Sequence, residues 1–215
     1  MKTISPDMPV KLGRCAFELF AERGFAGVNL DDIASRAGVT KGSLYWHYDS
    51  KKQLVLAACN HYYRDWHEQV HIAIAPHASP TARLAAALRF SVKSCVINPR
   101  NRLFTTGVFK LLNEDKEVCS SWAQFYSAVR EFFVGLILSA QAAGEIDASV
   151  DARRSVDLML EAIEGIKLRA AFEPHIADFS EQKATVDQLL GIFRVRQAGV
   201  AAKSIPTGTA RRRKK

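Results

Sequence analysis

The stretch over residues 29–52 constrains what this chain can fold into more than any other part of the sequence. Asn29 suits the N-cap of a helix, and Asp32 stands three positions later, where a capping box places its acid. Apolar residues at helical spacing follow, and Gly38 supplies the left-handed residue that ends a helix. Thr40 then caps a second short helix. Two short helices joined by a glycine-containing turn predict a helix-turn-helix.

The second short helix is rich in hydrogen-bond donors and cations, and residues 40–48 contain no acid. Only Leu44 is an obvious core anchor. Because a DNA major groove presents acceptors on its base edges between rows of phosphates, a donor-rich and acid-free helix suits it. The next helix opens at Ser50 with Gln53 in an S-x-x-Q pattern, and its first amides add an anion site. The alternative is a solvated polar face on a structural helix, for which two aromatic residues and a glycine are an unusual choice.

These residues resemble the DNA-binding signature of the TetR family of transcriptional repressors. The resemblance covers roughly the first sixty residues and is denser than a single helix-turn-helix pattern. It rests on FAGVNLDDIA at residues 25–34, AGVTKGSLYWHY at residues 37–48 and SKKQL at residues 50–54. It implies an all-helical homodimer in which each subunit has a small N-terminal reading head and a larger body that binds a small-molecule inducer.

The resemblance also implies which residues contact double-stranded DNA. Those expected to contact bases or phosphates are Thr40, Lys41, Ser43 and Tyr45, and those expected to contact phosphates are His47 and Lys51. The chain departs from the family pattern at Asn29, Tyr48 and Lys52, where Thr or Ser, Phe and an acid are common. Lys52 either adds a phosphate contact or adds nothing.

The rest of the chain is predicted to be helical, because apolar residues recur at helical spacing and no stretch alternates long enough for a strand. The fold class is therefore all-α, a three-helix helix-turn-helix head on a larger helical-bundle body with about nine helices in total. We expect the head at residues 1–52, the body at residues 53–200 and a disordered basic tail at residues 201–215. The expected helices cover residues 10–23, 30–37, 40–45, 50–74, 80–98, 103–112, 117–143, 150–172 and 180–200.

Charge is distributed unevenly along the chain, whose formal net charge is +8. Residues 1–64 hold nine Lys or Arg against six acids, residues 199–215 hold six against none, and the part between them is close to neutral. A basic head and a basic tail favour a polyanion as partner over an acidic small substrate.

The sequence also predicts a cytosolic protein without a membrane segment or a disulfide framework. It contains no signal-peptide pattern, and its longest uncharged apolar run, at residues 132–144, is shorter than the roughly 20 residues that span a bilayer. The four cysteines are scattered and form no C-x-x-C pair, so neither a disulfide framework nor a zinc ribbon is indicated. A redox-sensing pair is the alternative to small core residues.

A small-molecule site is expected around the long helix at residues 117–143, which is apolar over much of its circumference and should lie at the centre of the body. Aromatic walls favour flat apolar or aromatic ligands, and methionine adapts to irregular ones. For each lining residue the alternative is ordinary core. The residues expected to line the site are Trp66, Phe109, Phe125, Phe133 and Met159.

A histidine cluster gives the strongest alternative function. His67, Glu68 and His71 fit the H-E-x-x-H pattern of zinc proteases, and His77 stands where an extended form has its third histidine. Ile74, however, occupies the position at which that form needs a glycine. We therefore predict no cofactor, no metal and no enzymatic activity, with a metal-dependent enzyme as the alternative.

The two C-terminal helices have apolar faces wider than one core contact needs. In the family the corresponding pair forms a four-helix dimer interface, and Gly165 permits a close helix crossing. The sequence thus predicts a homodimeric repressor that binds a palindromic operator and is released by an apolar or aromatic inducer. A DNA-binding protein that has no inducer is a further alternative.

Overall fold

The computed structural model describes residues 7–192, and every regular element in this range is helical. The prediction of an all-α fold with nine α-helices is confirmed for these residues. The α-helices are α1 (Met8–Arg23), α2 (Leu30–Ala37), α3 (Lys41–Tyr45), α4 (Lys51–Ile74), α5 (Pro80–Val92), α6 (Pro99–Leu111), α7 (Lys116–Ala142), α8 (Ala152–Arg169) and α9 (Phe179–Ile192). A π-helix at Lys93–Ile97 follows α5, and a 3₁₀ helix at Pro174–Ala177 precedes α9.

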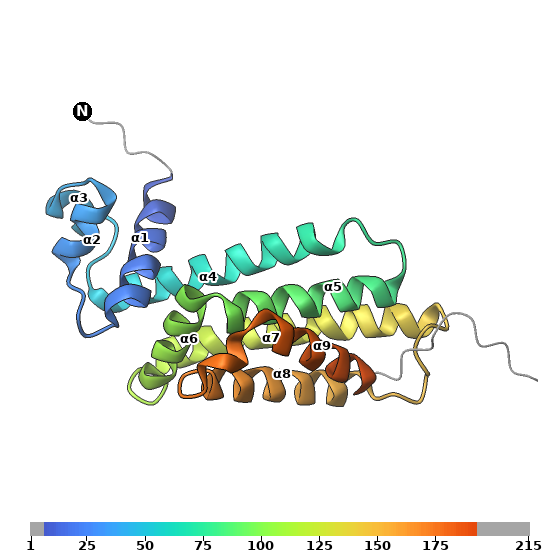
Figure 1. The fold of residues 1–215 in the computed structure, drawn as a ribbon. Coiled ribbons are helices and arrows are strands. Elements are labelled where there is room, and N and C mark those ends of the chain that lie inside the picture. Colours follow the sequence, from blue (N-terminus) through green and yellow to red (C-terminus); the bar gives the residue numbers. More distant parts are fainter. Residues whose placement is uncertain (1–6, 193–215) are drawn as a thin grey trace, which may run out of the picture.

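The helices form a head and an elongated body. Figure 1 shows α1, α2 and α3 grouped at one end of the molecule, where α4 begins. From this end α4 runs along the body, and α5 returns beside it. The long helix α7 packs against α4, α5 and α8, which gives it the central place expected from its apolar composition. Because α4 carries on from the head into the body, it is the continuous connection between the two.

Local capping produces the head helices as predicted. The Asn29 side chain accepts a hydrogen bond of 2.9 Å from the Asp32 amide, and the Asp32 side chain accepts one of 2.9 Å from the Asn29 amide. Gly38 ends α2 in the left-handed conformation with φ 66°. Thr40 Oγ1 then accepts from the Ser43 amide at 3.2 Å and begins α3.

The start of α4 differs from the predicted capping box. Ser50 Oγ accepts from the Gln53 amide at 3.3 Å, as expected. The Gln53 side chain, however, accepts from the Asp49 amide at 2.8 Å, one residue before the N-cap. The Gln53 side chain thus pairs with the Asp49 amide in the turn that leads into α4, and not with the Ser50 amide as a capping box requires.

The helix expected at residues 80–98 changes character before its end. The α-helical part ends at Val92, and a π-helix continues to Ile97, with the Asn98 amide bonded to the Lys93 carbonyl at 3.0 Å. Asn98 then caps α6, and Pro99 stands at its first position, where a missing N–H costs nothing. The next helix was expected at residues 103–112 and begins earlier, at Pro99, because Asn98 and Pro99 form its start.

Helix α8 is shorter than expected, and the predicted last helix is described only in part. The helix predicted at residues 150–172 is α8 at Ala152–Arg169, because Asp151 caps it and accepts a bond from the Arg154 amide. The last predicted helix extends to residue 200, and its part beyond residue 192 lies outside the described residues. The predicted basic tail at residues 201–215 lies outside them too.

The hydrophobic interior consists of two clusters, and the first of them includes both head and body. It contains Phe20 and Leu44 from the head together with Phe104 and Trp122 from the body. The second fills the body between α4, α5, α7, α8 and α9. The head boundary at residue 52 stays a prediction, and the first cluster crosses it.

Two glycines mark places where head and body approach closely. A Cβ at Gly13 in α1 would lie 2.9 Å from the Ala57 carbonyl oxygen in α4. A Cβ at Gly107 in α6 would lie 2.8 Å from the ring of Phe25, which belongs to the connection between α1 and α2. Any larger residue at either position would force neighbouring atoms to move.

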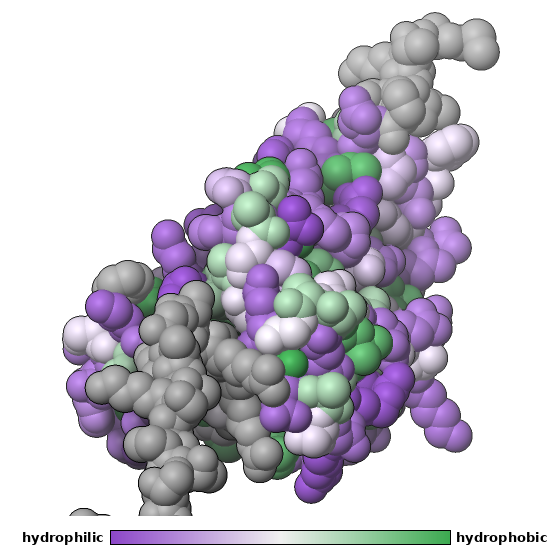
Figure 2. Space-filling view, turned by 90° about the vertical axis from the view of Figure 1, so that its right-hand side faces the viewer, coloured by the Kyte–Doolittle hydropathy of each residue, from purple (hydrophilic) through white to green (hydrophobic). Residues whose placement is uncertain are grey.

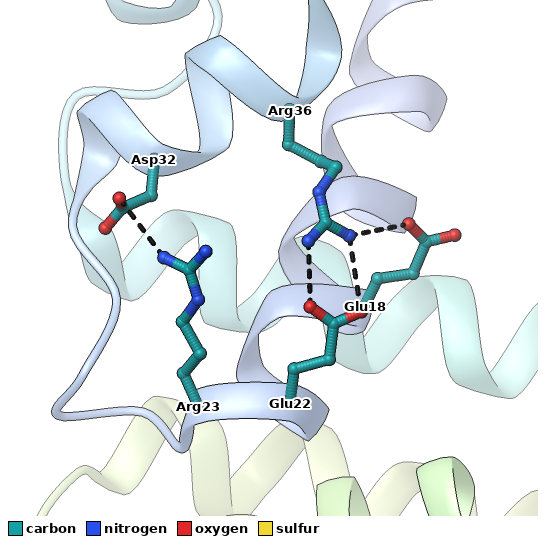
Figure 3. A network of polar contacts seen from close by, with 5 residues as sticks. All are labelled: Glu18, Glu22, Arg23, Asp32 and Arg36. Atoms are coloured by element: carbon teal, nitrogen blue, oxygen red, sulfur yellow. Dashed lines mark hydrogen bonds and ion pairs between the residues drawn. The ribbon is translucent and has the colours of Figure 1, made fainter.

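Ion pairs fasten α2 to α1 within the head. Arg36 contacts Glu22 at 2.8 Å and Glu18 at 3.5 Å, and Arg23 contacts Asp32 at 3.4 Å (Figure 3). The hydrogen bond from Arg36 lowers the pKa of Glu22. Since exposed pairs are screened by salt, they orient the two helices more than they stabilise the fold.

The surface is mixed in character. Figure 2 shows the end of the molecule opposite the head, where hydrophilic residues cover much of the face and hydrophobic residues are scattered among them. Within residues 7–192 no helix is both long enough and apolar enough to cross a membrane.

Candidate functional site

Helix α3 presents a polar face that a single apolar residue holds in place. Leu44 is fully buried in the first cluster, whereas Thr40, Lys41 and Tyr45 are exposed. Ser43 is half-buried, and its amide is used by the Thr40 cap. The structure therefore brings the four predicted base-contacting or phosphate-contacting residues of α3 together on one short helix.

Lys41 has an acidic partner in this structure. Its Nζ lies 2.9 Å from the Asp31 carboxylate on α2, and both side chains are largely exposed. This hydrogen bond raises the pKa of Lys41 above its ordinary value. The Lys41 Nζ also lies 6.0 Å from the centre of the Tyr45 ring, which places both side chains on the same side of α3.

Two further residues at this face were not among the predicted site residues. A Cβ at Gly42 would meet no heavy atom within 4 Å, so the α3 backbone is open to close approach from outside. Trp46 is 67% exposed, which is a large exposed apolar area for a residue that does not pack in the core. Its ring lies 5.0 Å from that of His47, which is half-buried. The glycine and the tryptophan were visible in the sequence as odd choices for a surface helix.

The two lysines at the start of α4 differ in their surroundings. Lys52 Nζ lies 2.7 Å from Glu117 and 3.9 Å from Asp115, at the start of α7. Hydrogen bonding to Glu117 raises the pKa of Lys52. Lys51 has no acidic partner among residues 7–192. Of the two outcomes left open for Lys52, its position favours the one without a phosphate contact.

The body contains a cavity of about 30 Å³ between α4, α5, α6, α7 and α8, which we call the aromatic cavity. Three of the five predicted ligand-binding residues line it, Trp66, Phe125 and Phe133. Met159 does not line it and is fully buried in the second cluster. Phe109 does not line it either, because its ring is 38% exposed on α6, with Lys167 Nζ 4.7 Å from the ring centre.

Polar groups converge on the aromatic cavity from several helices. Trp66 Nε1 donates to Ser91 Oγ at 3.3 Å, and the Tyr62 hydroxyl lies 3.4 Å from Cys95 Sγ. Burial raises the pKa of Tyr62 and of Cys95, which keeps both groups neutral. Trp122 also lines the cavity, and its indole N–H is buried and has no hydrogen-bond partner among the described residues.

A buried ion pair completes the lining of the aromatic cavity. Lys167 is only 2% exposed, and its Nζ lies 2.5 Å from Glu164 Oε2 on the same helix. Tyr126 donates its hydroxyl proton to Glu164 Oε1. The distance between Lys167 Nζ and Glu164 Oε2 marks a close ion contact, although its geometry is not that of a hydrogen bond. The sequence prediction missed Glu164 and Lys167, although two charges on the apolar stripe of α8 were a visible signal.

The histidine cluster does not form a metal site in the described part of the chain. His67 and His71 are exposed on one face of α4, with ring centres 4.6 Å apart. Among residues 7–192 no three His, Cys, Asp or Glu side chains come together in a way that could hold a metal ion. All four cysteines are free, and Cys15 and Cys59 are buried.

Comparison with known proteins gives the same picture for the head. Residues 14–58 match the family model of the bacterial regulatory proteins of the tetR family. The chain is 27% identical over 187 residues to the HTH-type transcriptional regulator TtgR of Pseudomonas putida, which covers 83% of this chain and 88% of that protein. It is 51% identical over 39 residues, 18% of this chain and 21% of the relative, to the negative regulator IcaR of the icaADBC biofilm operon in Staphylococcus aureus.

The fold of most of the chain is also shared with solved structures. A transcriptional regulator from Saccharomonospora viridis, solved in complex with choline, superposes with a TM-score of 0.76 over 87% of this chain and 97% of that chain, at 16% identity. The relatives are transcriptional regulators and not enzymes, which removes the metal-dependent enzyme as an interpretation of the histidines. The match at residues 14–58, the all-α architecture and these relatives together show that the head is of the tetR-family type and that the chain is similar to transcriptional regulators that carry such a head.

Proposed function

We propose that this protein is a homodimeric repressor that binds a palindromic operator through α3 and is released when a small molecule enters the aromatic cavity. The single observation that carries the DNA-binding part is the acid-free exposed face of α3, held in place by the buried Leu44. A helix of this kind fits the major groove, where base edges and phosphates are acceptors.

Each residue of the DNA-binding surface has a proposed role. Tyr45 and Lys41 reach base edges, and for Lys41 this requires exchange of Asp31 for an acceptor on DNA. Asp31 and Lys41 are both exposed, so little desolvation opposes this exchange. Thr40 and Ser43 flank them on the same helix, while His47 and Lys51 contact the phosphates beside the amides that begin α4.

The open backbone at Gly42 supports a close approach of α3 to DNA. A Cβ at this position would have no heavy atom of the protein within 4 Å. A side chain there would therefore extend into the space that we assign to DNA. Trp46 extends this surface at the end of α3, where its exposed indole packs against sugar and phosphate.

The proposed dimer interface lies on α8 and α9. Leu158 and Leu168 on α8 are 40% and 61% exposed within the single subunit, and Phe172, just beyond the end of α8, is 67% exposed. A Cβ at Gly165 would meet nothing within 4 Å, so a helix of a second copy has room to approach there. Leu158 and Gly165 are seven residues apart, which places them on one face of α8.

The inducer is proposed to be a flat, largely apolar molecule that carries a hydrogen-bond acceptor. At about 30 Å³ the aromatic cavity holds no more than one or two waters, so a ligand must displace side chains to enter. The unpartnered Trp122 N–H and the Lys167 ammonium are the donors that would meet its acceptor. The choline complex of the Saccharomonospora viridis regulator supports a ligand-binding body in this fold.

Release would follow from movement of α4. Trp66 borders the aromatic cavity on α4, and the same helix begins at Ser50 beside the phosphate-binding residues. A ligand that fits only when Trp66 moves favours a second position of α4, and a ligand shifts an equilibrium only through such a difference in affinity. In a dimer this changes the spacing of two reading heads that must match half-sites about 34 to 36 Å apart.

The test is an operator selection on the purified protein, followed by affinity measurements on the selected site. Tyr45→Ala should weaken operator binding by about 1 to 3 kcal/mol and relax its sequence preference. Leu103→Ala, on an exposed position of α6, is the control with unchanged affinity. Equal operator affinity of wild type and Tyr45→Ala would remove α3 from base reading.

The small size of the aromatic cavity favours one alternative function, a DNA-binding protein that has no inducer. The two functions differ in their response to hydrophobic metabolites and drugs added to the protein–operator complex. Release of the operator by a compound that also quenches Trp66 or Trp122 fluorescence supports the inducer. If no compound releases the operator, the constitutive function takes its place.

A further inference from the structure

We propose that the protein has a second small-molecule site, separate from the aromatic cavity, which binds an amphiphilic anion. The site is a groove of about 270 Å³ where α4, α5 with its π-helix and α9 meet, and we call it the α5–α9 groove. Its volume is close to the lower end of the range of ligand pockets, about 300 Å³. Its apolar lining consists of Ala73, Ala86, Phe90, Val92, Ile97 and Val186.

The groove and the aromatic cavity are distinct places in the body. They share no lining residue, although both reach the segment that runs from α5 into the π-helix. Helix α9 packs against α5 and against the π-helix, so it closes the groove on one side. A ligand can therefore bind in this groove while the aromatic cavity is empty and no DNA is bound.

Three cations surround the apolar lining. Arg89 and Lys93 lie one turn apart on the α5 segment, and Lys183 lies across the groove on α9. All three are exposed, and none has an acidic partner among residues 7–192. Like charges one turn apart repel each other. A bound anion would remove that repulsion, while the aliphatic stems of the cations extend the apolar wall.

A buried polar atom gives an independent indication of a ligand. Gln182 lines the groove and is 2% exposed, and its Nε2 donates to the Ile176 carbonyl. This bond fixes the orientation of the amide, because the opposite orientation would place two acceptors together. Gln182 Oε1 is buried and has no hydrogen-bond partner. Buried acceptors are rarely left unpaired, so a donor on a molecule in the groove would satisfy this oxygen once the covering atoms move aside.

These features together define the class of ligand. An aliphatic or aromatic tail would pack against Phe90 and Val186, and a carboxylate would lie between Arg89, Lys93 and Lys183 at the rim. A hydroxyl or amide N–H near the carboxylate would donate to Gln182 Oε1. The groove thus favours a medium-chain carboxylate over a neutral or cationic molecule of the same length, and a hydroxylated one over its parent.

The test uses four probes that have the same eight-carbon chain: octanoate, 3-hydroxyoctanoate, octanamide and octylammonium. Calorimetric titration of the full-length protein without DNA should give saturable octanoate binding with a dissociation constant below about 1 mM. Octanamide should bind at least tenfold more weakly, and octylammonium should not bind. The hydroxyl of 3-hydroxyoctanoate should improve affinity several-fold, and Gln182→Leu should abolish that improvement.

Variants locate the site. The double variant R89Q/K183Q should weaken octanoate binding at least tenfold, whereas K110Q, which removes an exposed cation of α6, should not change it. Ala73→Phe fills the half-exposed edge of the groove and should block all binding, with circular dichroism as the check on folding. The proposal is overturned if octanoate fails to bind, if R89Q/K183Q binds it as wild type does, or if octylammonium binds equally well. It is overturned too if octanoate is displaced by a ligand of the aromatic cavity, because the anion would then occupy that cavity.

Discussion

Lys52 Nζ at the start of α4 lies 2.7 Å from Glu117 Oε2 in the first turn of α7. These residues are far apart in sequence, and the contact joins the start of α4, where we propose phosphate contacts, to the helix that carries Trp122 and Phe125. A cation beside the proposed DNA-binding surface is thus paired within the protein, whereas its neighbour Lys51 has no acidic partner among residues 7–192.

The two lysines should therefore contribute differently to DNA binding. Lys51→Gln should lower the slope of log affinity against log salt by roughly 0.9 for each phosphate that is no longer neutralised, or about 1.8 for a dimer. Lys52→Gln should leave the slope unchanged, because its charge is already paired with Glu117. Fluorescence anisotropy with an operator duplex at several salt concentrations measures both slopes. A lower slope for Lys52→Gln would show that Lys52 leaves Glu117 to contact DNA.

Gly42 should separate folding from DNA binding. Gly42→Leu adds a side chain to an exposed helical position, so it should leave stability unchanged or raise it by up to about 1 kcal/mol. The same side chain should reduce operator affinity at least tenfold by filling the space that DNA needs. Gly135→Leu is the matched control, since Gly135 is exposed in α7 and equally open. Operator binding that survives in Gly42→Leu would contradict a close approach of α3.

Trp122 should matter to the ligand more than to the fold. Trp122→Phe loses packing in the first cluster but also removes a buried N–H that has no partner, which offsets part of the loss in melting temperature. The affinity of an acceptor-bearing inducer should fall by about 1 kcal/mol, or roughly fivefold. The control ligand is the same compound without its acceptor oxygen, whose affinity should be equal for both proteins. An equal loss for both ligands would mean that Trp122 contributes only shape.

The dimer interface should be sensitive to charge on α8. Leu168→Glu places a carboxylate where a second copy would pack, so the dissociation constant of the dimer should rise at least tenfold. Leu103→Glu has a similar exposure, 57% against 61%, but lies on α6 and should leave the dimer intact. Sedimentation velocity over a concentration series distinguishes the two. A monomeric wild-type protein would remove the proposed interface altogether.

His61 should make stability depend on pH. Burial lowers the pKa of His61 from its ordinary value of 6.5, and Asp65 opposes this only in part. The unfolded chain therefore binds the proton more tightly, and the stabilisation present above pH 6.5 is lost as the pH falls below this value. His61→Asn should flatten the fall in melting temperature between about pH 7.5 and 5.5. His77→Asn is the control, and equal slopes for wild type and His61→Asn would contradict this account.

Features that depend on neighbouring residues in sequence could be predicted from the sequence. The caps at Asn29 and Thr40 and the left-handed glycines Gly38 and Gly144 follow from short-range hydrogen bonding and backbone sterics, and all are present. The dense signature around α3 also allowed the tetR-family head to be predicted, and that prediction is confirmed.

Features that depend on contacts between distant segments could not be predicted. The π-helix at Lys93–Ile97 is only 5 residues long, so apolar periodicity cannot distinguish it from the end of the preceding α-helix. The Lys52 contact with Glu117 and the unpartnered Gln182 oxygen arise only when α7 and α9 pack. Phe109 is exposed and lies outside the aromatic cavity. This position could not be predicted, because the sequence of α6 does not indicate which of its apolar residues face the interior.

The hydrophobic interior that crosses residue 52 determines where the head could be exchanged to change the DNA sequence that this protein recognises. A reading head exchanged at residue 52 would leave behind Leu54 and Ala58, which its own helices need to bury. It would also have to supply a group that fits over Gly107, because a Cβ at this position would lie 2.8 Å from the Phe25 ring and force it to move. A functional chimaera must therefore carry the first three turns of α4 with the head, and its partner must have a small residue in α6.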